Sequence, residues 1–253
     1  MTRLCFAALV LGLLLALTAS SLVAQNDKPI TTLAPQWSQK APTIDGKLAE
    51  GEWAQATKVE TRLSLYTIPN LQLSKELPTT VYATNDAENL YLAIVIKGED
   101  YDATWQEGNV RMDLLALRFD ADNDGKDSLG DDQKVLAALN STYLDQYRVK
   151  MQAPNDFADD PQQDGKGAIT HSTQAGKGDY VAELAIPLNT HTAEDLAATP
   201  GDELYFQLLY AHAFGSTTGD LAVGLIAGGG TLQDIMAGLV PSACAKLKLA
   251  TQP

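Results

Sequence analysis

The chain has 253 residues, and its 18 Lys and Arg against 32 Asp and Glu give a net charge of −14. Hydrophobic residues make up 45% of the sequence, so the composition is globular and excludes a disordered acidic tail. The excess of acidic residues argues against a nucleic-acid-binding face and against adsorption to anionic lipid. An acidic surface instead suits neutral sugars, divalent cations or basic partners.

Residues 1–24 have the organisation of a secretory signal peptide. Arg3 precedes an apolar run from Leu4 to Leu17, and small residues follow up to Ala24. The run is shorter than the roughly 20 residues that a membrane-spanning helix needs. We therefore expect cleavage after Ala24 and a secreted or periplasmic protein, with no membrane association once the signal peptide is removed.

The remaining sequence predicts strands separated by turns. Residues 25–42 contain three prolines and are expected to form an extended lead-in, and residues 43–253 are expected to form one domain. Runs rich in β-branched, aromatic and alternating residues predict strands at 79–84, 90–97, 114–119, 143–151, 180–187, 203–212 and 243–249. Helical patterns are confined to residues 49–56 and 192–197. This pattern favours an all-β, antiparallel sandwich with one or two short helices.

Five segments in this order resemble family 9-like carbohydrate-binding modules. They are the I-D-G…E-W opening at 43–56, the hairpin strands at 81–93, the strand and acidic turn at 117–122, the E-x-x-I-P strand at 182–187 and the Gly-initiated strand at 201–208. The resemblance implies the immunoglobulin-like sandwich that these modules share with the DOMON-like superfamily. It also implies a non-catalytic protein whose partner is a polysaccharide or oligosaccharide, although other members of the wider group bind haem.

Two residues of the shared motifs have a structural interpretation. Trp53 follows an acidic turn, and we expect its ring to cap one end of the sandwich core. Glu183 lies in the middle of a strand, on the face opposite Tyr180 and Leu184. We expect Glu183 to face solvent or a loop, or to pair with an arginine such as Arg118.

The sharpest chemical signal is the acidic loop at 119–132. Asp120, Asp122 and Asp124 alternate and Gly125 follows, a spacing that lets a tight loop turn three carboxylates onto one hard cation. Ser128 and Asp131 occupy the ninth and twelfth positions, where an EF-hand loop places its last ligands. These five residues predict a calcium site grafted on a β-sandwich, and the alternative is a solvated acidic loop.

Candidate sugar ligands are aromatic residues in polar surroundings. Trp105 and the neighbouring Tyr101 lie in a polar stretch, and Tyr66 follows a strand. The three histidines have no zinc-ligand spacing and no G-x-S-x-G elbow is present, so the sequence predicts no enzyme.

Two alternatives to sugar binding remain at this point. One is a structural or adhesive surface protein that binds another protein. The other is non-covalent binding of haem b, for which the axial ligands would come from Met112, Met151, His171, His212 or a lysine.

Overall fold

The computed structural model describes residues 30–67, 72–99, 103–106, 109–151, 157–174, 177–190, 192, 195–214, 222–228, 239 and 243–253. The predicted signal peptide at 1–24 lies outside these residues. So do Tyr101 and much of the glycine-rich segment at 215–241. Across the described ranges, none of the helical structure is long and apolar enough to cross a lipid bilayer.

The described residues form fifteen strands and a single 3-10 turn, η2 (Leu139–Ser141). The strands are β1 (Thr32–Leu33), β2 (Gln36–Trp37), β3 (Thr57–Thr67), β4 (Gln72–Asn85), β5 (Asn89–Glu99), β6 (Ala103–Gln106), β7 (Asn109–Phe119), β8 (Asp132–Ala137), β9 (Thr142–Arg148), β10 (Phe157–Asp159), β11 (Lys166–Gln174), β12 (Lys177–Pro187), β13 (Glu203–Phe214), β14 (Ala222–Ala227) and β15 (Ala245–Lys248). The predicted all-β class is confirmed.

The short helices expected at 49–56 and 192–197 are not formed by the described residues. Residues 50–55 make successive turns, because Gly51 adopts a φ of +79°, a left-handed conformation that stops a right-handed helix. Thr192 and residues 195–197 are irregular. There the Thr192 hydroxyl donates to the Asp195 carboxylate at 2.7 Å, and this carboxylate is directed toward the protein interior.

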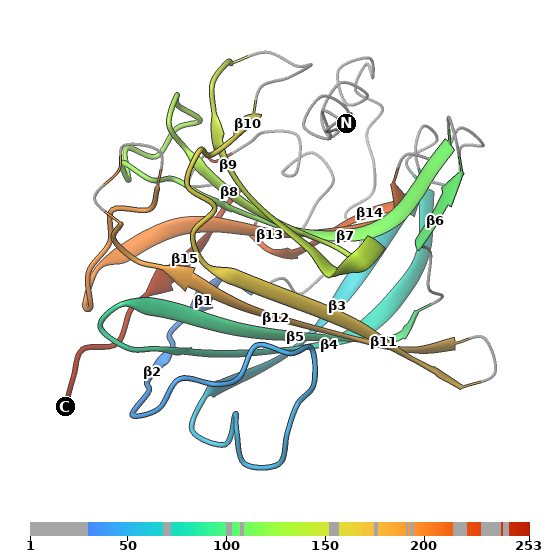
Figure 1. Ribbon diagram of the computed structural model, residues 1–253, viewed down its shortest axis with the longest axis horizontal. Helices are drawn as coiled ribbons and strands as arrows, with labels where there is room; N and C mark the ends of the chain where they lie inside the picture. The colour runs from blue at the N-terminus through green and yellow to red at the C-terminus, as the bar shows by residue number, and fades with distance from the viewer. Residues whose placement is uncertain are drawn as a thin grey trace.

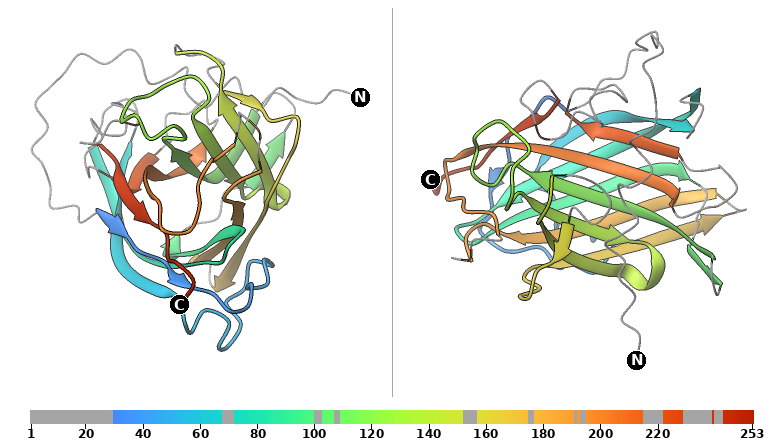
Figure 2. Two further views of the ribbon diagram at one scale, coloured as in Figure 1. Left: turned by 90° about the vertical axis from the view of Figure 1, so that its left-hand side faces the viewer. Right: turned by 90° about the horizontal axis from the view of Figure 1, so that it is seen from above.

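The strands form two layers that enclose one core (Figures 1 and 2). One layer has the order β10–β9–β8–β7–β13 and the other β3–β4–β5–β12–β11. β14 joins the layers, since it pairs with β13 and, at its beginning, with the end of β3. The pairing along this path is antiparallel, while the marginal pairs β1–β15 and β2–β4 are parallel.

The core lies between the layers and consists of the inward side chains of alternating strand positions. Leu92, Ile94 and Ile96 of β5 face Leu115 and Leu117 of β7, among many other buried aliphatic residues. Opposite the β14 junction, β11 closes the sandwich against β9 and η2. The Ile169 amide donates to Ser141 Oγ at 2.7 Å, and a Cβ added to Gly167 would lie 2.9 Å from atoms of Leu136 and of the Tyr143 ring.

A buried ion cluster interrupts this core near one end. Lys134 of β8 lies on the same face of its strand as the core residue Leu136, and it is fully buried. Its Nζ is 2.9 Å from Asp132 Oδ1 and 3.2 Å from Asp195 Oδ1, and it also contacts Asp145 Oδ1. The three carboxylates offer oxygens within 4.8 Å of one another, and Lys134 supplies their cation.

A strap formed by residues 43–56 covers the outer face of β5 and β12. Trp53 of the strap packs on Tyr91, Ala93 and Ala185 in a small cluster that is separate from the main core. The prediction that Trp53 caps one end of the core is therefore wrong, because the ring covers the back of a sheet.

Glu183 of β12 holds the strap in place and is fully buried beneath it. Its carboxylate accepts hydrogen bonds from the amides of Asp45 at 3.0 Å and Gly46 at 2.8 Å, and from Trp53 Nε1 at 3.0 Å. Of the expected alternatives, the one in which Glu183 faces a loop is confirmed, and the pairing with Arg118 is not formed, since Arg118 Nε donates to Gln133 Oε1 in the other layer. The shared I-D-G…E-W and E-x-x-I-P motifs thus meet in one structural contact.

Candidate functional site

The acidic loop connects β7 to β8 and gathers its first three carboxylates. Oxygens of Asp120, Asp122 and Asp124 lie within 4.8 Å of one another. The Gly125 amide donates to Asp120 Oδ2 at 2.8 Å and the Asp124 amide to Asp120 Oδ1 at 3.1 Å, so the loop turns around the buried Asp120 side chain. Gly125 has a φ of +75°, which explains why glycine stands at the bend.

The two other predicted ligands join the same group. Ser128 Oγ lies 3.4 Å from both Asp122 Oδ2 and Asp131 Oδ1, and the Ser128 amide donates to Asp131 Oδ2 at 2.6 Å. Burial raises the pKa of Asp120 and that of Asp131 to about 6, although backbone amides oppose the shift. The structure thus brings together the five oxygen-bearing side chains that the spacing selected.

Two of the predicted aromatic ligands, Trp105 and Tyr66, belong to strands at the opposite end of the sandwich. Trp105 is in β6, whose backbone pairs with the beginning of β7 at Val110, whereas the acidic loop begins after the last residue of β7. The Trp105 side chain and all of Tyr101 lie outside the described residues. Tyr66 is half-buried near the end of β3.

The strand register places Tyr66 and Trp105 at the same end of the molecule. Met112 of β7 pairs both with Ala103 of β6 and with Phe214 of β13. A few residues along, β13 pairs with the beginning of β14, and β14 pairs there with Tyr66 and Thr67 of β3. The strand ends that carry the two aromatic residues therefore lie at the same end of the molecule, with β7, β13 and β14 between them (Figure 1).

A buried polar cluster at this end was missed by the sequence analysis. His212 Nδ1 lies 3.0 Å from Asp113 Oδ1 and 3.4 Å from Glu99 Oε1, and Lys75 Nζ is 2.5 Å from Glu99 Oε1. Burial alone would lower the pKa of His212, but its hydrogen bond to Asp113 and the charges of both carboxylates raise it overall. The available signal was a carboxylate, Asp113, directly before the apolar run Leu114–Leu117.

The haem alternative gains no support from the described side chains. Met151 is about half exposed (52%), whereas Met112 is buried. His171 Nε2 is 3.0 Å from the Glu99 carbonyl oxygen, and His212 Nδ1 is 3.0 Å from Asp113 Oδ1.

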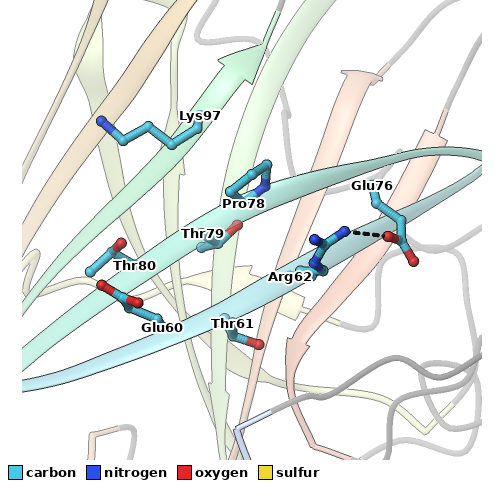
Figure 3. Close-up of a pocket in the computed structure, with 8 residues that line it drawn as sticks. All are labelled: Glu60, Thr61, Arg62, Glu76, Pro78, Thr79, Thr80 and Lys97. Carbon is cyan, nitrogen blue, oxygen red and sulfur yellow. Dashed lines mark hydrogen bonds and ion pairs between the residues drawn. The ribbon is translucent and has the colours of Figure 1, made fainter.

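A groove of about 730 Å³ lies on the outer face of β3, β4 and β5 (Figure 3). Its walls carry charged and hydroxyl side chains, and Arg62 Nη1 bridges two strands to Glu76 Oε2 at 2.8 Å. Lys97 is likewise paired, with Asp179 at 2.5 Å. The residues that line this groove include no aromatic ring, so it lacks the stacking surface that sugar recognition requires.

Comparison with known proteins places the chain in a family. Residues 44–223, more than half of the chain, match the carbohydrate family 9 binding domain-like family. The chain therefore belongs to this family of carbohydrate-binding-module-like domains. No curated protein matches the chain.

Solved structures of the same fold are similar over most of their length. A family 9 carbohydrate-binding module from Caldicellulosiruptor kristjanssonii, solved with cellotriose and with glucose, superposes with a TM-score of 0.52 at 12% identity. In the cellotriose complex the match covers 88% of this chain and 95% of the module. A Bacteroides uniformis protein, provisionally assigned as carbohydrate-binding, gives a TM-score of 0.54 at 8% identity, with 87% and 99% coverage.

Proposed function

We propose that this protein is a non-catalytic module, secreted or periplasmic, that binds a polysaccharide or oligosaccharide at the end of the sandwich where Tyr66 and Trp105 lie. The observation that carries the proposal is the register that places both strand ends at one end of a family 9-like sandwich. Aromatic faces suit the apolar C–H surface of a sugar ring, while nearby polar groups bond its hydroxyls. The module solved with cellotriose and glucose supports the same ligand class.

Replacing Trp105 by alanine tests this site. We expect the Trp105→Ala variant to lose saccharide binding, because a stacking ring at the centre of a binding surface carries a large part of the affinity. Its melting temperature should change little, because the residue belongs to a polar segment. The measurement is binding to a glycan array and to cellotriose by calorimetry, with melting followed by circular dichroism.

Tyr205→Ala is the matched control. Tyr205 is a half-buried aromatic residue near the beginning of β13, at the end of the sandwich that carries the acidic loop. This variant should keep full binding. Binding that persists in Trp105→Ala would contradict the proposed site, and a large loss of stability in that variant would show that Trp105 belongs to the core.

We also propose that the acidic loop binds calcium and that the ion stabilises the fold without touching the sugar. Support comes from the convergence of five oxygen donors, Asp120, Asp122, Asp124, Ser128 and Asp131. β7 has 11 residues, so its two ends are about 30 Å apart, given a rise of about 3.3 Å per residue. An ion at the far end of this strand cannot contact a ligand near Trp105.

Calcium at millimolar concentration is expected to raise the melting temperature of the protein, since a ligand that binds only the folded state stabilises it. Asp122→Ala should remove this rise. Asp164→Ala, which deletes a carboxylate from a different loop, should leave it intact. A melting temperature that does not respond to calcium would show that the loop is only a solvated acidic turn.

A further inference from the structure

A hollow of about 810 Å³ lies between the lead-in and the strap, away from the site proposed above. One wall is the segment that begins with β2 and contains Trp37, Gln39 and Lys40. The other is the turn of the strap that contains Glu50 and Gln55. The volume is within the range of about 300–1,000 Å³ that is typical of small-molecule sites.

Trp37 is the aromatic residue that lines this hollow. Unlike Trp53, which is buried and hydrogen-bonded to Glu183, Trp37 is half-exposed. It belongs to neither hydrophobic cluster formed by the described residues. Because the ring lines a hollow, it offers an apolar face that a ligand of suitable shape can cover, with a gain in free energy.

The backbone around Trp37 is fixed in place. β2 pairs in parallel with the end of β4, with Trp37 opposite Asn85. The Ser38 amide donates to the Asn85 carbonyl at 2.7 Å, and Thr84 Oγ1 donates to the Gln36 carbonyl at 2.6 Å. Because these bonds hold the backbone on both sides of Trp37, the attachment point of its side chain is fixed before any ligand arrives, which reduces the entropic cost of binding.

The polar groups that face the ring remain available. Within the part of the chain that the structure describes, the side chains of Gln39, Glu50 and Gln55 form no hydrogen bond to the protein. Two amides and a carboxylate provide both donors and acceptors, as the hydroxyl groups of a sugar require. Lys40 offsets one of the two carboxylates that line the hollow, Glu50 and Glu52, so the lining keeps a small negative charge that disfavours anionic ligands.

We propose that this hollow is a second saccharide site, which takes a neutral sugar unit stacked on Trp37 and bonded by Gln39, Glu50 and Gln55. The inference rests on the proposed function for its ligand class, a saccharide. Its location does not depend on the site proposed there. Trp37 pairs at Asn85, the last residue of β4, whereas Tyr66 pairs at Leu73 near the beginning of that strand. The two sites are thus about 40 Å apart along β4, and one trisaccharide cannot bridge them.

The test is calorimetric titration of the wild-type chain with cellotriose, repeated with xylotriose and mannotriose. We expect two sugars per chain. Trp37→Ala should reduce the stoichiometry to one, and Trp37→Phe, which keeps a ring, should retain both sites. Gln55→Ala removes only an exposed amide and should weaken the second site without affecting folding, so the test holds even if Trp37→Ala is unstable.

The outcomes separate this inference from the proposed function. Binding that Trp105→Ala abolishes and that neither Trp37→Ala nor Gln55→Ala alters would overturn the second site and leave the first. Binding that survives in Trp105→Ala and is lost in Trp37→Ala would support the hollow and refute the proposed location of the first site. No binding of any of the three trisaccharides would overturn both.

Discussion

Replacement of Lys134 by methionine is expected to lower the free energy of unfolding by about 3–5 kcal/mol, the range measured when one partner of a buried ion cluster is removed. The lysine is fully buried and is the cation shared by Asp132, Asp145 and Asp195. Methionine preserves most of its volume but leaves three carboxylates with no positive charge. Urea unfolding at pH 7.5 measures the loss.

The loss should depend on pH. Burial raises the pKa of Asp132 to about 7 and that of Asp145 to about 6, even though Lys134 opposes the shift. A carboxyl group whose pKa is higher in the folded than in the unfolded protein binds its proton more tightly when folded, so its contribution to stability is lost as the pH rises. Removing Lys134 raises both pKa values further. The variant should therefore recover part of its stability near pH 5.

Lys246→Met is the matched control for this experiment. Lys246 also pairs with a carboxylate, Glu203, at 2.7 Å, but both side chains are about half exposed (47% each). Exposed pairs contribute about 0–1 kcal/mol, so this variant should unfold close to the wild type. If Lys134→Met costs no more than Lys246→Met, the buried cluster does not stabilise the fold.

The second large effect is expected at Glu183. Glu183→Ala removes the acceptor for two backbone amides and one indole N–H, all three of which belong to the strap. A buried donor that loses its partner costs about 1–3 kcal/mol, so we expect a total loss of about 3 kcal/mol or more. The fluorescence of Trp53 should shift to longer wavelength as the strap separates from the sheet.

Two further variants define the cause. Glu183→Gln keeps an acceptor oxygen but turns an NH₂ group toward a donor, so it should lose less stability than alanine. Glu52→Ala removes a carboxylate from the strap itself, where it accepts one exposed bond from the Thr43 amide at 2.5 Å. This control should cost little. Unchanged stability and fluorescence in Glu183→Ala would mean that the packing of Trp53 alone holds the strap.

Features encoded by neighbouring residues were predictable from the sequence. The strands follow from alternating and β-branched runs, and the acidic loop follows from a spacing that acts within twelve residues. Asp122 and Asp131 both contact Ser128 because a short loop leaves their side chains few other positions.

Features that depend on contacts between distant parts of the chain were not predictable. Trp53 and Glu183 are 130 positions apart, and no local pattern indicates that they meet. Likewise, no local pattern distinguishes Lys134 from an ordinary surface lysine. In the fold, β8, β9 and the segment after β12 place three aspartates around it. The helix predicted at 49–56 does not form, for a local reason. Gly51 adopts a left-handed conformation, and the prediction gave more weight to the helical pattern than to this glycine.

The two edge strands of the sheet affect how the protein behaves in concentrated solution. An exposed strand margin can recruit a strand from another molecule and begin aggregation. Here one margin is β10, which has only three residues, and the other is β11, whose Ile169 amide is already bonded to Ser141. The three-residue β10 therefore offers little template for intermolecular strand addition, whereas the nine-residue β11 has only one such amide donor engaged by Ser141. Strand addition between molecules in concentrated solution is thus expected at β11 and not at β10.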